Sequence, residues 1–193
     1  RREVPKAEPF DAAIRPDFQT QYSYFPAVPK PIIAAINGPA AGLGLIMSLY
    51  CDIRIASDAA VFTTAFSRRG LIAEHGISWL LPRIVGHAHA LDLTLSARRV
   101  EPSEALRMGL VNQVLPAEEH MSGVMDYALD LAENVSPRST RIMKRQIYEA
   151  LMQDLAEAVR AANVEMFQSF SSDDFREGVA HYVEKRPAAF TGT

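Results

Sequence analysis

The chain has 193 residues, of which 48% are hydrophobic and 22% are charged, enough apolar sequence for a domain with a buried core. A formal net charge of −3 provides no field that would attract nucleic acid or an anionic membrane. The sequence has one cysteine and no apolar stretch long enough to span a bilayer. We therefore expect a cytoplasmic protein from a reducing compartment, with no nucleic-acid or membrane partner.

The first 29 residues are rich in proline and poor in pattern, so an irregular lead-in is expected. Its one regularity is the roughly helical spacing of Asp17, Phe18, Tyr22 and Phe25. This spacing predicts one short helix near residues 16–25. Its aromatic side chains are expected to pack onto the domain.

A glycine-rich turn follows the first strand. Residues 32–36 form a β-branched apolar run typical of a buried strand, residues 37–39 turn the chain, and residues 40–44 are small. An apolar helix is predicted from about residue 45 to residue 50. A helix N-terminus after such a turn presents free N–H groups to a negatively charged oxygen. The Lys and Ser/Thr of a phosphate-binding loop are missing, so an oxyanion hole and a simple packing turn remain as alternatives.

Strands and helices alternate up to residue 115. The pattern predicts strands at residues 53–57, 60–65 and 110–115, a loop at 70–76, and helices at 77–81, 87–96 and 102–108. Pro82 is expected to restart its helix, and Gly109 to cap the end of another in the left-handed conformation. Helices alone follow, at residues 117–134, 137–153, 155–169 and 172–185, with Ser136 and Ser172 expected as N-caps of the second and the last of them. The fold class is therefore α/β followed by an α-helical region.

Motifs in one consistent order carry a resemblance to a known family. They are Asn37-Gly38-Pro39-Ala40-Ala41-Gly42-Leu43-Gly44, Cys51-Asp52-Ile53, Phe62, Gly70-Leu71-Ile72-Ala73-Glu74, Leu81-Pro82-Arg83-Ile84-Val85-Gly86, Glu104-Ala105, Gly109-Leu110-Val111, Asp174-Phe175-Arg176-Glu177-Gly178 and Glu184-Lys185-Arg186. Across residues 30–190 the chain resembles the core of the enoyl-CoA hydratase/isomerase (crotonase) superfamily.

The resemblance implies a fold and an assembly. Residues 30–115 would form part of a crotonase-like spiral of ββα turns, after the lead-in of residues 1–29. Residues 116–193 would form a C-terminal helical trimerisation region, giving a homo-oligomer that is a trimer or a dimer of trimers. The apolar faces of the late helices, with Ile142, Ile147, Leu151 and Leu155, would need a partner surface unless they are buried within one chain.

The resemblance also implies an acyl-CoA substrate. Coenzyme A would enter as part of the substrate, with no separate cofactor and no metal. The backbone N–H of Leu43, between Gly42 and Gly44, would be one oxyanion donor. In the family the second donor and much of the CoA contact come from a strand-rich segment that precedes this point and is absent from this sequence.

The resemblance places one catalytic carboxylate. Hydratases of the family use two glutamates, and the matching positions here are Ile46 and Phe66. Glu74 stands where the Δ3,Δ2-enoyl-CoA isomerases carry their single catalytic glutamate, whereas His75 is expected at the surface or in an orienting role. The favoured hypothesis is double-bond isomerisation by Glu74. A hydratase and a non-catalytic acyl-CoA-binding or scaffold protein are the alternatives.

Other candidate residues concern substrate binding. Phe62, Phe66 and Trp79 are candidates for the acyl pocket, with core packing as the alternative for each. Lys185 and Phe190 loosely match the region that contacts CoA from a neighbouring subunit. Because the lead-in often covers the acyl pocket in the family, it could also act as a lid.

Overall fold

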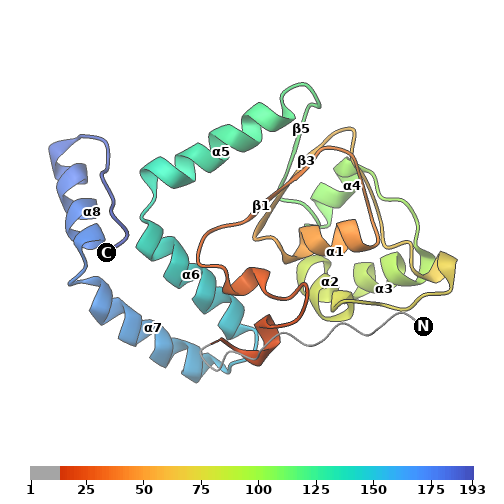
Figure 1. Ribbon diagram of the computed structural model, residues 1–193, viewed down its shortest axis with the longest axis horizontal. Helices are drawn as coiled ribbons and strands as arrows, with labels where there is room; N and C mark the ends of the chain where they lie inside the picture. Colours follow the sequence, from red (N-terminus) through yellow and green to blue (C-terminus); the bar gives the residue numbers. More distant parts are fainter. Residues whose placement is uncertain (1–13) are drawn as a thin grey trace.

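The computed structural model describes residues 14–193 (Figure 1). Residues 1–13 of the predicted lead-in lie outside the described residues. The single short helix predicted near residues 16–25 is wrong, because two separate 3₁₀ turns are found instead. They are η1 (Pro16–Phe18) and η2 (Phe25–Ala27). Each has a proline in its first two positions, where no N–H is needed.

Two parallel sheets organise the chain. One contains β1 (Ile33–Ile36), β3 (Ile53–Ser57) and β5 (Gln113–Leu115) in that order. The other pairs β2 (Pro39–Ala41) with β4 (Val61–Thr63). The sequence did not predict β2, because small residues with a leading proline are typical of a turn. The strand forms because Ala40 is buried opposite Phe62, and Pro39 stands at the strand's start, where a missing N–H is tolerated.

Each of the first two strand pairs is followed by a helix. The helices of this part of the chain are α1 (Leu43–Tyr50), α2 (Ile77–Val85), α3 (His87–Ser96) and α4 (Pro102–Arg107). The order β1-β2-α1 and then β3-β4-α2 is the ββα spiral that the resemblance implied. Helix α1 begins at Leu43, two residues before its predicted start. Gly109 has a φ of +77°, which confirms the left-handed cap after α4.

Helix α2 runs through Pro82, so the predicted restart at this residue is wrong. The missing N–H leaves the Ser78 carbonyl without its helical partner, but Ser78 is exposed and water can replace it. One turn on, the Arg83 side chain donates to the Trp79 carbonyl at 2.9 Å. Leu81 and Val85 are buried on either side of the proline and hold the helix against the core.

The hydrophobic core is one cluster drawn from residues 36–111. It includes Ile46 of α1, Phe62 of β4 and Leu81 of α2. The core therefore packs the two sheets and the early helices together, and it fixes the strand-to-helix turn at the start of α1.

The last four helices form an arc along one side of the molecule (Figure 1). They are α5 (His120–Asn134), α6 (Pro137–Ala150), α7 (Leu155–Ser169) and α8 (Asp173–Glu184). The predicted caps of α6 and α8 are confirmed. Ser136 Oγ accepts from the Ser139 N–H at 3.0 Å, and Ser172 Oγ from the Phe175 N–H at 3.1 Å. Within residues 14–193, none of the helices has the length and apolar character that crossing a membrane requires.

Candidate active site

The glycine turn between β2 and α1 is held in a conformation that suits only glycine. Gly42 has φ +53° and ψ −119°, a combination that a side chain strongly disfavours. Its N–H donates to the Thr63 carbonyl at 3.1 Å, so the turn extends the β2–β4 ladder. Its carbonyl accepts from the Ile46 N–H at 3.0 Å and closes the first turn of α1. The turn is therefore fixed from both sides.

The Leu43 N–H is available to a ligand. Leu43 is the first residue of α1, where backbone N–H groups have no partner within the helix. Among residues 14–193, no group accepts a hydrogen bond from this N–H. Leu43 is 39% exposed. A fixed N–H that is left without a partner at a helix N-terminus is suited to a developing oxyanion.

The loop before α2 carries Glu74 in a tight conformation. Gly70, His75 and Gly76 all have positive φ, of +69°, +52° and +80°. The Glu74 carbonyl accepts from the Ile77 N–H at 3.1 Å, which turns the chain directly into α2. The Glu74 side chain is 34% exposed, and its Oε2 lies 3.8 Å from His75 Nε2. Glu74 is therefore an accessible carboxylate on a constrained loop.

The positions that match the two hydratase glutamates are closed to substrate. Ile46 is 0% exposed and Phe66 is 7% exposed, and both belong to the hydrophobic core. Phe62 is also buried in this core. Three residues are candidates for the acyl pocket, with core packing as the alternative for each. Phe62 and Phe66 pack in the core.

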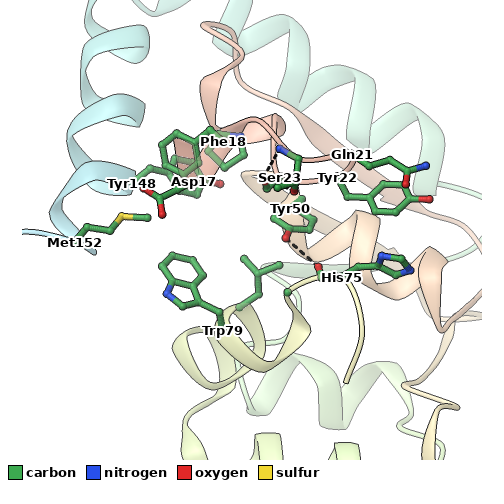
Figure 2. Close-up of a pocket in the computed structure, with 14 residues that line it drawn as sticks. Asp17, Phe18, Gln21, Tyr22, Ser23, Tyr50, His75, Trp79, Tyr148 and Met152 are labelled. Atoms are coloured by element: carbon green, nitrogen blue, oxygen red, sulfur yellow. Dashed lines mark hydrogen bonds between the residues drawn. The ribbon is translucent and has the colours of Figure 1, made fainter. Parts of the chain in front are cut away.

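A cavity of about 480 Å³ lies between the lead-in and helices α1, α2 and α6 (Figure 2). Trp79, the third candidate, lines it, and the Arg83 guanidinium lies 4.1 Å from the ring centroid of Trp79. The other wall residues are mostly aromatic or apolar and come from segments far apart in the sequence: Asp17, Phe18, Thr20, Gln21, Tyr22, Ser23, Pro26, Tyr50, His75, Gly76, Leu80, Tyr148 and Met152. Since His75 and Gly76 are in the wall, the cavity adjoins the loop that carries Glu74.

One hydrogen bond and one ring contact connect the cavity walls to that loop. The Tyr50 hydroxyl donates to the His75 carbonyl at 3.0 Å (Figure 2). The Tyr22 ring meets the His75 ring edge to face, with centroids 4.9 Å apart. Burial raises the pKa of Tyr50, so its hydroxyl remains a donor at neutral pH.

A buried ion pair supports the α6 side of the cavity. Lys144 Nζ donates to Asp52 Oδ2 at 2.8 Å and to the carbonyls of Phe25 and Lys30 at 3.1 Å. The Tyr148 hydroxyl donates to Asp52 Oδ1 at 3.0 Å. Burial, with the charge of Asp52 beside it, raises the pKa of Tyr148 well above its ordinary value. This network connects α6 to the lead-in and to the start of β1.

The suggested CoA contacts lie elsewhere in this chain. Lys185 ends α8 in the left-handed conformation, with φ +55°. The Phe190 ring packs on His181, with centroids 5.8 Å apart. Both residues lie at or against α8, and α8 lies away from α2 (Figure 1). A single chain therefore does not bring them to Glu74.

Sequence reasoning missed several residues of the cavity. The sequence pattern places Tyr50 and Tyr148 only within predicted helices, although they join the cavity to the Glu74 loop and to Asp52. The lead-in aromatics Phe18 and Tyr22, which share a roughly helical spacing in the sequence, line the cavity. Because the cavity is assembled from α1, α2, α6 and the lead-in, no local pattern could have revealed it.

Comparison with known proteins identifies the family. The family model described as enoyl-CoA hydratase/isomerase matches residues 3–193. A probable enoyl-CoA hydratase of Rhodobacter capsulatus is 34% identical over 94% of this chain and 70% of its own length. The 1,2-epoxyphenylacetyl-CoA isomerase of Escherichia coli is 36% identical over 86% of this chain and 63% of its own length. The chain belongs to the enoyl-CoA hydratase/isomerase family.

Solved structures agree on the fold. The crystal structure of a probable enoyl-CoA hydratase/isomerase from Mycobacterium abscessus matches with a TM-score of 0.86 and 31% identity, over 94% of this chain and 72% of the other. An enoyl-CoA hydratase from Bacillus anthracis matches with a TM-score of 0.87 and 30% identity, over 91% and 68%. The protein is thus a crotonase-fold enzyme of acyl-CoA chemistry. The names of its relatives include both hydratases and an isomerase.

Proposed function

We propose that this protein moves a double bond of an enoyl-CoA thioester from C3 to C2, with Glu74 as the only proton carrier. The observation that supports this most directly is the contrast between carboxylate positions. Glu74 is accessible on its loop, whereas both positions that match the hydratase glutamates are buried apolar side chains. Hydration needs two proton transfers managed by different groups, but isomerisation needs one proton to leave and return.

The proposed reaction uses the two constrained elements of the site. The Glu74 carboxylate removes a proton from C2 of a 3-enoyl thioester, and the C–H electrons form a dienolate. The negative charge on the thioester oxygen is stabilised by the Leu43 N–H, a type of donor whose loss typically lowers the rate on the order of 10²–10³-fold. Protonated Glu74 then returns the proton at C4, which gives the 2-enoyl thioester. A bound thioester would itself shield Glu74 from water.

Hydration of a 2-enoyl-CoA is the second candidate. The close approach of His75 Nε2 to Glu74, 3.8 Å, supplies a second titratable group beside the carboxylate. In that reaction Glu74 and His75 would share the activation of water and the second proton transfer. The names of several relatives favour this reaction.

Glu74→Gln tests the assignment. The substitution keeps the size of the side chain and removes the proton carrier, so conversion of 3-enoyl-CoA to 2-enoyl-CoA should fall at least about 10³-fold. Turnover is followed by absorbance of the conjugated 2-enoyl thioester, with 2-enoyl-CoA hydration assayed in parallel. Glu118→Gln is the matched control, since Glu118 is exposed just before α5.

Each result selects one function. Isomerisation that is lost in Glu74→Gln but kept in Glu118→Gln supports the proposal. Hydration alone, abolished by Glu74→Gln, would select the hydratase. If Glu74→Gln retains full turnover, the catalytic role of Glu74 is wrong. CoA-thioester binding without turnover would point to the non-catalytic alternative.

The cavity and the helical arc suggest where substrate and partner copies bind. We place the acyl group of the substrate in the cavity beside Trp79, because its wall is largely aromatic and adjoins the Glu74 loop. We place a second copy of the chain on the exposed apolar side chains of α6 and α7, among them Ile147 and Phe167. Sedimentation equilibrium should show a trimer or a dimer of trimers, and a monomer would contradict this assembly.

A further inference from the structure

Helix α1 connects the proposed oxyanion donor to the loop that carries the proposed proton carrier. Its first residue, Leu43, provides the oxyanion N–H, and its last, Tyr50, reaches the loop that carries Glu74. The helix has eight residues, so at about 1.5 Å per residue it is roughly 12 Å long. Most of its side chains are buried in the core. It is therefore a short rigid link between two groups that must act on one substrate.

The contact at the end of this link is a hydrogen bond to the main chain. The Tyr50 hydroxyl donates to the His75 carbonyl at 3.0 Å, one residue after Glu74. At Gly76 an added Cβ would lie only 2.5 Å from Tyr50 Oη. Gly76 is thus needed both for its φ of +80° and for the close approach of this hydroxyl.

The loop contains strain that an external contact must oppose. His75 has a φ of +52°, which is unfavourable for a residue with a side chain. Its ring packs against Tyr22, and its carbonyl receives the Tyr50 hydroxyl. Without the hydroxyl, the peptide between His75 and Gly76 could rotate, and the Glu74 carboxylate would move with it.

We propose that Tyr50 is a positioning residue for Glu74. Its hydrogen bond to the His75 carbonyl holds the carboxylate loop at a set distance from the Leu43 N–H, so that both groups meet the same enolate. This inference rests on the proposed function, because it takes Glu74 as the proton carrier and the Leu43 N–H as the oxyanion donor. Tyr50 itself is assigned no contact with the reacting atoms.

Tyr50→Phe removes only the hydroxyl and keeps the buried ring. We expect kcat for isomerisation to fall about tenfold with KM changed less than twofold, since misplacing a catalytic group lowers rate more than binding. Tyr127→Phe is the matched control, because Tyr127 is a partly exposed tyrosine of α5 outside the site. A raised KM with unchanged kcat would make Tyr50 only a wall of the cavity and overturn the proposal.

A double-mutant cycle with Glu74→Asp separates positioning from general packing. Glu74→Asp withdraws the carboxylate by one methylene group, so Tyr50→Phe should reduce kcat less in that background than in the native one. If the two reductions simply multiply, Tyr50 does not act through Glu74. If Glu74→Gln is fully active, the proposed function fails on its own, whatever Tyr50→Phe does.

A measurement without substrate provides a second test. Hydrogen exchange at the Ile77 N–H, which donates to the Glu74 carbonyl, should accelerate in Tyr50→Phe while the amides of β3 keep their protection. Faster exchange throughout the core would mean that Tyr50 only stabilises packing. Unchanged exchange at Ile77 would mean that the hydroxyl does not hold the loop. Either result overturns the proposal.

Discussion

The early part of the chain and its C-terminal arc bury different kinds of side chain. Between residues 36 and 111 the buried cluster is hydrophobic and continuous. In the arc, α5 buries His120 and Val124, α6 buries Lys144, α8 buries Asp174, and α7 buries none of its residues. The first region is stabilised mainly by apolar burial. From α6 to α8 the arc is held to its own chain mainly by a few directional polar contacts.

The two buried charges anchor the arc at different points. Lys144 joins α6 to Asp52 and to two carbonyls of the lead-in side. Asp174 accepts from the Ser136 hydroxyl at 2.5 Å and from the N–H groups of Thr191 and Gly192 at 2.9 and 3.0 Å. Polar anchors leave the apolar residues of α6 and α7 exposed. These exposed apolar residues are the surface on which we proposed above that a second copy binds.

The largest expected difference in the free energy of unfolding is between two Leu→Ala variants, one from each region. Leu81→Ala removes a side chain that is 0% exposed, so the free energy of unfolding should fall by about 3 kcal/mol. Leu155→Ala changes a side chain that is 81% exposed, so at dilutions where the chain is monomeric the change should stay within about 0.5 kcal/mol. Urea denaturation measures both. Equal losses would show that the arc has an apolar core of its own.

The next effect concerns the Lys144 anchor. Lys144→Met leaves the Asp52 carboxylate, whose side chain is 15% exposed, without its cation, although the Tyr148 hydroxyl and the Ile32 N–H still donate to it. We expect the free energy of unfolding to fall by about 2 kcal/mol, which is below the range for an uncompensated buried charge. Lys30→Met is the control, since Lys30 is exposed. If chemical denaturation shows no difference between the two variants, the ion pair does not stabilise the arc.

The sequence predicted most of the elements because local signals were strong. Strand β3 and helices α3 and α7 have their predicted bounds, and the caps at Ser136 and Ser172 follow from side-chain chemistry. The errors came where tertiary contacts overrode local preference. Pro82 is tolerated inside α2 because buried neighbours hold the helix, and β2 forms because Ala40 packs opposite Phe62.

The site was predictable only in part. A pattern could locate the glycine turn at Gly42 and, through the resemblance, a carboxylate at Glu74, because each depends on a short stretch of chain. The wall of the cavity combines residues more than one hundred positions apart, such as Tyr22 and Tyr148. The hydroxyl of Tyr50 meets a carbonyl 25 residues later. Such contacts arise from packing and leave no periodic signal.

The smallest effect concerns the Asp174 anchor and depends on pH. Burial alone would raise the pKa of the Asp174 carboxyl, but hydrogen bonds from Ser136, Gly192 and Thr191 outweigh it and hold the pKa below its ordinary value. A carboxyl with a lowered folded pKa stabilises the protein above its unfolded pKa, about 4, and the contribution disappears as pH falls through the folded pKa.

Asp174→Asn should therefore lower the free energy of unfolding by about 1 kcal/mol at neutral pH. The difference from the native protein should shrink as the pH falls below about 4. Asp126→Asn is the control, because Asp126 is exposed on α5. Unfolding free energies measured by urea denaturation between neutral and acidic pH give the comparison. A difference that stays constant with pH would show that the charge of Asp174 is not what holds the C-terminal residues to α6.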